Sequence, residues 1–313
     1  MNFMTAIQTE NLTKKFGELT AVDALTLSIS EGELFGLVGS DGAGKTTTMR
    51  MLTGIMEPSS GEAWVMGRQV RSEAEAIKEQ IGYMSQRFGL YPDLSVLENI
   101  HFYADIYGLP RKGRETIIEQ LLSFSNLTPF AKRKAGNLSG GMKQKLGLAC
   151  ALVHTPKVLF LDEPTNGVDP VSRRDFWRIL YNLLKEGVAI FVSTAYLDEA
   201  DRCNRVGLIH NGKLLACDTP ENLKKLMQGT ILEIRTAEPR NAARLLRERL
   251  GDVAVSLFGD KVHLVSHDSD RTKESAAAFL EQQGIPVLSL RPVEPALEDV
   301  VVSLIQDTAD SGG

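Results

Sequence analysis

A glycine-rich segment that follows the apolar run 33–38 carries the clearest chemical signal. It fits the pattern GxxxxGK[ST] and reads Gly39-Ser40-Asp41-Gly42-Ala43-Gly44-Lys45-Thr46-Thr47. Glycines let the backbone curl until its N–H groups converge on phosphate oxygens, and a following helix adds its dipole. Lys45 supplies a charge to the outer phosphates, and the Thr46 hydroxyl is placed to ligate Mg²⁺. The strand before it and the helix after it favour a nucleotide-phosphate site over a chance glycine-rich turn.

Two carboxylates follow the apolar run 158–161. A strand buried on both faces delivers side chains at its carboxyl end, where open α/β sheets bind ligands. Asp162 would hold Mg²⁺ through water, and Glu163 would orient or deprotonate the water that attacks the γ-phosphate. A strand end capped by acids with no catalytic role is the alternative, which the neighbouring phosphate segment disfavours.

A second nest for phosphate is predicted before the helical run 143–153. It consists of Leu138-Ser139-Gly140-Gly141-Met142. A serine and two glycines at a helix N-terminus gather backbone N–H groups as the first segment does. One nucleotide does not need two nests from one chain, so this nest would serve a nucleotide held by a second subunit. The sequence thus predicts a head-to-tail dimer with nucleotide at its interface.

With these motifs in this order, the chain resembles the ABC ATPase family over residues 5–228. The resemblance implies ATP and Mg²⁺ as ligands, with Glu163, Lys45 and Gln86 as catalytic residues and Thr46, Gln86 and Asp162 as metal ligands. Phe16 matches the aromatic that stacks on adenine, although a core position is its alternative. Gln86 matches the glutamine that touches Mg²⁺ and senses a membrane subunit, and a plain surface amide is its alternative. Asp169 matches the loop that couples the two sites across the dimer.

One branch of the family is matched more closely. Residues 86–110, which include Phe88-Gly89-Leu90-Tyr91, and residues 294–300 look like the motor subunits of ABC-2 type exporters of drugs, polysaccharides and lipids. Residues 86–110 would receive a coupling helix of a separate integral membrane permease; a helical subdomain with no docking role is the alternative. The resemblance places the chain at the cytoplasmic face of the cell membrane through that permease. Both a homodimer and a heterodimer with another ABC ATPase fit it.

Three positions depart from the family pattern: Met142 replaces the usual glutamine, Asp41 replaces Asn or Ser, and Ala195 replaces a histidine that bridges the γ-phosphate and the catalytic glutamate. Alanine donates no such hydrogen bond, and losing a group of this kind can lower the rate by about 10²–10³. The alternative function is therefore a regulatory or degenerate ATP-binding subunit with little hydrolysis of its own.

The expected fold is an α/β P-loop NTPase with an antiparallel β part and a helical subdomain at about 88–155, together forming a domain over 1–228. Strands are expected to start at Ile7-Gln8-Thr9 and to cover 25–29. From Thr230 the order βαββαβ predicts a small α+β ferredoxin-like domain over 229–306. Residues 307–313 are expected to form a frayed tail.

The charge pattern, the heptad pattern and the apolar runs of the sequence disfavour other classes of function. The net charge is −5, and the sequence has no long run of charges of one sign. No nucleic-acid-binding surface is therefore expected. A DNA-repair ABC protein would need a long coiled coil and a ribosomal one a second ATP domain, and neither pattern occurs in the sequence. No apolar run reaches the ~20 residues of a spanning helix, so a link to a membrane is expected through a partner.

Overall fold

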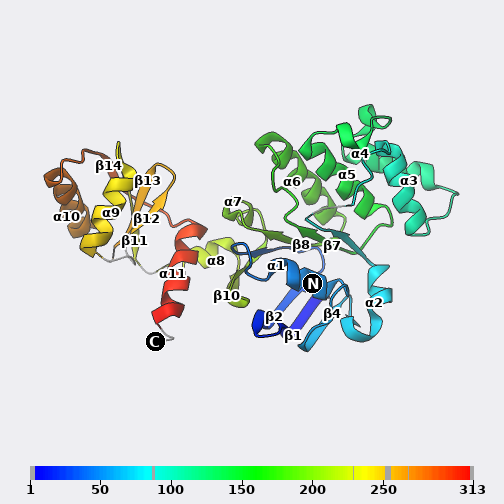
Figure 1. The fold of residues 1–313 in the computed structure, drawn as a ribbon, viewed down its shortest axis with the longest axis horizontal. Helices are drawn as coiled ribbons and strands as arrows, with labels where there is room; N and C mark the ends of the chain where they lie inside the picture. The colour runs from blue at the N-terminus through cyan, green and yellow to red at the C-terminus, as the bar shows by residue number, and fades with distance from the viewer. Residues whose placement is uncertain (1–3, 87–88, 228, 251–254, 267, 311–313) are drawn as a thin grey trace. The chain divides into compact units, whose positions relative to one another are not determined.

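The computed structural model describes residues 4–86, 89–227, 229–250, 255–266 and 268–310, so Phe88 of the exporter-like segment lies outside the described residues. The chain forms two compact units, residues 1–217 and 218–313. Figure 1 labels those of their elements for which there is room. This division lies earlier than the predicted boundary at 228, because α8 (Pro220–Lys224) contacts α11 (Leu297–Asp310) of the second unit. The prediction of a frayed tail over 307–313 is wrong for residues 307–310, because α11 continues to Asp310. Each residue added to a helix gains a backbone hydrogen bond.

A six-stranded sheet organises the first unit, in the order β10-β9-β3-β8-β7-β6. Its strands are β3 (Leu34–Val38), β6 (Ile81–Met84), β7 (Val158–Asp162), β8 (Ala189–Thr194), β9 (Arg205–His210) and β10 (Lys213–Asp218). The strands from β9 to β6 pair in parallel. Every residue of β3, β7 and β8 is buried, as expected for parallel strands covered on both faces. Their carboxyl ends therefore bring three loops to one edge of the sheet.

The predicted antiparallel part is a second sheet, in the order β2-β1-β4-β5. It contains β1 (Thr5–Phe16), β2 (Leu19–Ser30), β4 (Ser60–Val65) and β5 (Arg68–Gln69), and α2 (Val70–Lys78) follows it. Buried residues of β1 and β2 join those of β3 and of α1 (Lys45–Leu52) in one core cluster. This core fixes α1, the helix that begins at the phosphate segment.

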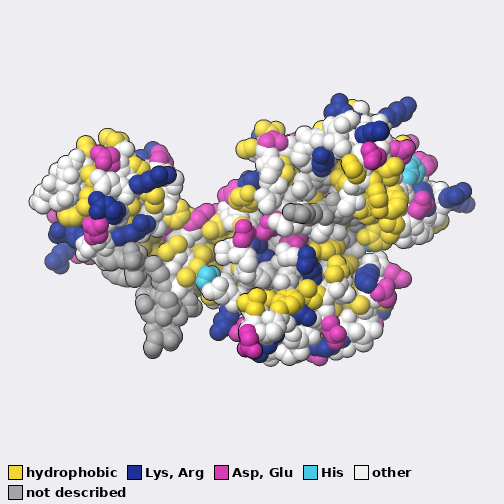
Figure 2. All heavy atoms as spheres, in the orientation of Figure 1, with side chains coloured by type: hydrophobic (Ala, Val, Ile, Leu, Met, Phe, Trp, Pro, Cys, Tyr) yellow, Lys and Arg dark blue, Asp and Glu magenta, His cyan; other side chains and the backbone are white. Residues whose placement is uncertain are grey.

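Helices fill the range in which a helical subdomain is predicted. They are α3 (Val96–Ile106), α4 (Arg114–Phe124) and α5 (Gly140–Leu152). A capping box starts α3: Ser95 Oγ accepts from Glu98 N at 3.2 Å, and Glu98 Oε2 accepts from Ser95 N at 2.7 Å. Hydrophobic side chains gather over the part of the molecule that holds α3 (Figure 2). Tyr91, 45% exposed, packs there edge-on against Phe102.

His154 joins the helical part to the parallel sheet. Its ring stacks on Tyr107 with centroids 3.8 Å apart, and Nε2 lies 2.9 Å from the carbonyl oxygen of Ile81. A carbonyl only accepts, so Nε2 carries the hydrogen, and the buried Nδ1 has no hydrogen-bond partner among the described residues. Burial lowers the pKa of His154, because a second proton would charge a ring that is removed from water.

This lowered pKa predicts a loss of stability in mild acid. The neutral ring stabilises the fold fully above the unfolded pKa of about 6.5, and this contribution is lost as the pH falls toward the lower folded pKa. The urea midpoint should therefore fall less between pH 8 and pH 5 in His154→Gln than in the parent. His101→Gln, at a partly exposed position on α3, is the matched control. Equal slopes for the parent and His154→Gln would contradict the assignment.

The second unit has the predicted βαββαβ order. Its elements are β11 (Thr230–Thr236), α9 (Pro239–Leu250), β12 (Val255–Phe258), β13 (Lys261–Ser266), α10 (Ser269–Gln282) and β14 (Val287–Val293). The strand order β12-β13-β11-β14 with antiparallel pairs is the ferredoxin-like arrangement, so this prediction is confirmed. His263 on β13 binds Asp299 at 3.0 Å, which ties α11 to this sheet.

Candidate nucleotide site

The loop between β3 and α1 has the shape that a phosphate cradle requires. Gly44 caps α1 with φ 106°, and Gly42 has φ 80°, both in the left-handed region that favours glycine. A Cβ at Gly44 would lie 2.4 Å from the carbonyl oxygen of Ala21, so only glycine fits there. The first backbone N–H groups of α1 have no partner within the helix and are available to an anion. Ser40 and Asp41 are exposed at the tip of this loop.

Lys45 lies at the mouth of the loop. It is 4% exposed, and Nζ donates to the carbonyl oxygens of Gly39 at 2.8 Å and Ser40 at 3.0 Å. The same ammonium lies 3.3 Å from Glu163 Oε1. The cation predicted to meet the outer phosphates is thus held in place and also contacts the predicted catalytic carboxylate.

Asp162 has the environment of a metal ligand. Its Oδ1 accepts hydrogen bonds from Thr46 Oγ1 at 3.0 Å and from Ser193 Oγ at 2.6 Å. Its Oδ2 is buried without a partner in the described parts of the chain. A buried carboxylate oxygen with nothing to bind is costly, and Mg²⁺ prefers oxygen ligands. Thr46 and Asp162 therefore fit a magnesium ion beside the phosphate cradle.

Glu163 is held at its backbone and by three side chains that contact its carboxylate. Its backbone has φ 48°, a left-handed conformation unusual for a non-glycine residue. Its N–H is fixed by the carbonyl oxygen of Ser193 at 3.1 Å. Besides the Lys45 contact, Oε2 accepts from Gln86 Nε2 at 2.8 Å and from Asn166 Nδ2 at 3.3 Å. The structure thus brings two of the predicted catalytic residues, Lys45 and Gln86, into contact with the carboxylate of the third, Glu163.

The second predicted nest is built differently. Ser139 caps α5, with Oγ accepting from Met142 N at 3.3 Å. Gly140 is exposed, whereas Gly141 and Leu138 are buried. A Cβ at Gly141 would lie 2.3 Å from Ser172 Cβ, so this glycine is needed for packing against α6 (Pro170–Lys185). None of the hydrogen bonds found for the nest within the described residues reaches the 39–47 loop.

Two further predicted residues occupy loop positions. Asp169 caps α6, with Oδ1 accepting from Val171 N at 3.1 Å and Ser172 N at 3.0 Å. The backbone hydrogen bond from Ser172 lowers the pKa of Asp169. Phe16 ends β1 and is 47% exposed, so the alternative core position is wrong. The Lys14 ammonium lies 5.3 Å from the centroid of its ring.

Sequence reasoning missed the residues that support this site. Ser193 binds Asp162 and fixes the backbone of Glu163. Thr194 and the fully buried Glu199 bind each other at 2.9 Å beside it. A signal for Ser193 and Thr194 is present in the sequence, because they follow the apolar run 189–192 and reach the same sheet edge.

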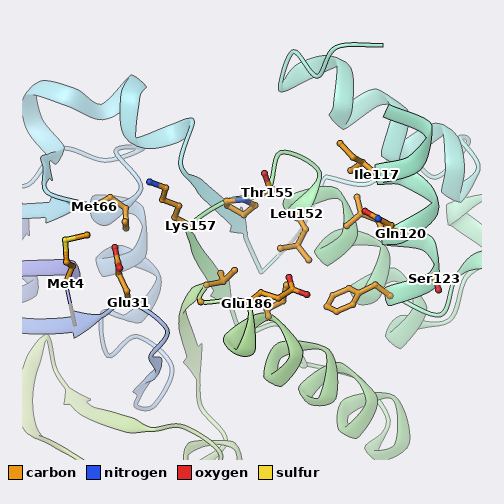
Figure 3. A pocket seen from close by; sticks show the side chains of 16 residues that line it. Met4, Glu31, Met66, Ile117, Gln120, Ser123, Leu152, Thr155, Lys157 and Glu186 are labelled. Carbon is orange, nitrogen blue, oxygen red and sulfur yellow. The ribbon is translucent and has the colours of Figure 1, made fainter. Parts of the chain in front are cut away.

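A cavity of about 1020 Å³ lies elsewhere in the first unit (Figure 3). Lys157 and Val188, which line it, directly precede β7 and β8. The cavity therefore lies at the amino ends of the parallel strands, whereas Gly39 and Glu163 follow carboxyl ends. Despite its size, this cavity is not the nucleotide site, because none of the residues that line it belongs to that site.

Together, a phosphate cradle, the Asp162 carboxylate beside it and a glutamate held by three side chains, all at one sheet edge, define a P-loop nucleotide-binding domain. A family model described as ABC transporter matches residues 22–166. The chain is 35% identical over 303 residues to the bacitracin transport ATP-binding protein BcrA of Bacillus licheniformis, covering 96% of this chain and 97% of that protein. The chain belongs to the family of ABC transporter ATP-binding subunits.

Two further comparisons agree with this family. The chain is 42% identical over 288 residues, 91% of its length, to the probable multidrug ABC transporter ATP-binding protein YbhF of Escherichia coli K12, and the match spans 49% of YbhF, about half of that relative. A solved structure, the dimeric post-hydrolysis state of the ATP-binding cassette MJ0796 bound to ADP and Pi, has a TM-score of 0.63 and 26% identity, covering 68% of this chain and 98% of that one. The predicted family and P-loop fold are confirmed. No helix in the described ranges has the length and apolar character that a membrane span requires.

Proposed function

We propose that this chain is the ATP-hydrolysing motor of an ABC-2 type exporter, dimerising head-to-tail around two ATP molecules and driving a separate permease. The observation that carries the proposal is the pairing of a full P-loop site with a second phosphate nest, at residues 138–142, whose hydrogen bonds within the described residues do not reach it. A nest with an exposed Gly140 backbone is suited to a nucleotide presented by a partner.

In this proposal, the Glu163 carboxylate accepts a proton from the water whose oxygen attacks the γ-phosphorus. The bond from that phosphorus to the oxygen shared with the β-phosphate breaks, which releases ADP and phosphate. Gln86 and Asn166 fix one carboxylate oxygen, which sets the direction of the other. Lys45 places a positive charge where negative charge develops on the γ-phosphate. Mg²⁺, held by Thr46, Gln86 and Asp162, would neutralise phosphate charge when bound. Phe16 would stack on the adenine, and Asp169 would face the partner subunit.

The exposed aromatic and apolar side chains around α3 are suited to receive a coupling helix of the permease (Figure 2). The relatives' names, bacitracin transport and probable multidrug ABC transporter, support a role in transport. In this proposal the direction is export, and the chain lies at the cytoplasmic face of a membrane. Homodimers and heterodimers both satisfy the geometry.

Complementation between two inactive variants tests the shared site. Lys45→Met disables the P-loop and leaves the nest intact. Gly140→Asp puts a carboxylate into the nest, and its Cβ fits because the nearest atom, the Gly167 carbonyl oxygen, is 3.5 Å away. Each variant alone should lack ATP turnover. In mixed dimers, the P-loop of one and the nest of the other form one intact site, so mixing should restore turnover. Failure to restore it, in a mixture shown to form mixed dimers, would rule out the head-to-tail motor.

A second candidate function, a subunit with slow turnover, rests on Ala195, which is exposed next to the site. If a missing histidine limits the rate, Ala195→His should raise kcat about tenfold or more, because a donor there would stabilise charge in the transition state. Phosphate release at saturating ATP measures this. Ala195→His combined with Glu163→Gln is the control and should show no gain. A parent that already turns over quickly and gains nothing from histidine would contradict the prediction.

A further inference from the structure

One buried carboxylate joins the loop that carries Glu163 to the loop that follows β8. Glu199, 0% exposed, accepts hydrogen bonds from Thr165 Oγ1 and from Thr194 Oγ1, the latter at 2.9 Å. Trp177 Nε1 on α6 donates to it at 3.4 Å. A buried carboxylate is stable only when such donors surround it. These hydrogen bonds therefore connect the two loops through Glu199.

Two residues that contact Glu199, Thr194 and Arg173, also contact Tyr196. The backbone N–H of Tyr196 donates to Thr194 Oγ1 at 3.0 Å. The Arg173 guanidinium lies 4.6 Å from the Tyr196 ring centroid, and its Nε is 3.5 Å from Glu199 Oε1. Cation–π contact of this kind restrains the ring. Tyr196 is 38% exposed but is held at its backbone and at its ring face.

The Tyr196 hydroxyl is connected to the Glu163 carboxylate through the side chain of Asn166. Tyr196 Oη donates to Asn166 Oδ1 at 3.4 Å, and Asn166 Nδ2 donates to Glu163 Oε2 at 3.3 Å. Donors in series polarise one another, and fixing the amide oxygen fixes which way the amide N–H points. Ala195, the neighbour of Tyr196, has no hydrogen-bonding side chain. Tyr196 is thus the side chain of this loop that is connected to Glu163.

We infer that Tyr196 is a positioning residue for Glu163, acting through Asn166. The inference rests on the proposed hydrolytic function of the site. Without the hydroxyl, Asn166 can rotate and Glu163 keeps Gln86 as its other side-chain amide donor. Because one neutral hydrogen bond is lost at a distance from the reacting atoms, kcat should fall about three- to tenfold, with the KM for ATP unchanged.

Tyr196→Phe in the 313-residue chain tests this, since it removes one oxygen and keeps the ring under Arg173. Tyr181→Phe is the matched control, because Tyr181 on α6 is similarly exposed, at 36%, and donates to a backbone oxygen, that of Arg202, at 3.3 Å. It should leave kcat unchanged. Asn166→Ala should lower kcat at least as much as Tyr196→Phe, and the double variant should match Asn166→Ala alone.

Three results would overturn the inference. The first is an unchanged kcat in Tyr196→Phe while Glu163→Gln abolishes turnover, which leaves the proposed function intact. The second is an equal further loss when Tyr196→Phe is added to Asn166→Ala, since the hydroxyl would then act by another route. The third is a parent without any turnover that depends on Glu163, which would remove the proposed function together with the inference.

Discussion

Glu163→Gln is expected to lower ATP turnover by about 10²–10⁴, the usual contribution of a positioned general base. The amide has the shape of the carboxylate and can still accept from Gln86, but it cannot take a proton from water. ATP binding should persist, because the phosphate cradle and Lys45 are unchanged. Phosphate release at saturating ATP measures the turnover, and light scattering with ATP and Mg²⁺ should detect stable dimers that the parent forms only briefly.

Glu119→Gln provides the control for this experiment. Glu119 is an exposed glutamate on α4, and its change to glutamine alters the net charge by the same amount. Its turnover should equal that of the parent. If Glu163→Gln kept the parent's rate, the water would be activated by another group, and the assignment of Glu163 would be wrong.

The chemical motifs were predictable because each combines a local sequence pattern with a simple fold rule. Apolar runs such as 158–161 form parallel strands buried on both faces, and carboxyl ends of parallel strands meet at one edge. That rule alone brings Lys45, Asp162 and Glu163 together. The ferredoxin-like unit was predictable for the same reason, since its strands and helices alternate in a recognisable order.

The long strands of the antiparallel sheet were predicted only in part. Thr5–Phe16 is one strand, although the sequence indicated only a start at Ile7. Register shifts interrupt the pairing of β1 with β2 between Thr9 and Leu12 and again on either side of Lys14. Asn11 has a φ of 49° there. Each bulge breaks the alternation of buried and exposed residues, so the period of two that identifies a strand disappears.

The support around Glu163 was not predictable from spacing. Glu199 follows Asp198 in a short acidic stretch, which is typical of an exposed helix start. Its partners come from other elements, Thr165 from the loop after β7 and Trp177 from α6, so only tertiary packing brings them to it. The same holds for the contact between Tyr196 and Asn166, which are thirty residues apart.

Lys45→Met should weaken ATP binding by about 30-fold or more, which is the lower range for removing one partner of a buried charge pair. Methionine keeps the length of the side chain but loses the charge and the hydrogen bonds to Gly39 and Ser40. Titration with a fluorescent ATP analogue measures the affinity. Lys78→Met, at an exposed lysine of α2 that pairs with Glu75, is the control and should bind like the parent.

The contact between Lys45 and Glu163 allows two roles of the lysine to be separated. Glu163→Gln removes a negative charge near the phosphates, so it should tighten ATP binding, whereas Lys45→Met should weaken it. If Lys45 served only to hold the Glu163 carboxylate, Lys45→Met would not weaken binding further in the Glu163→Gln variant. If the ammonium meets the phosphates directly, the loss of about 30-fold should persist in that variant. A vanishing effect would assign Lys45 to holding the base rather than to binding ATP.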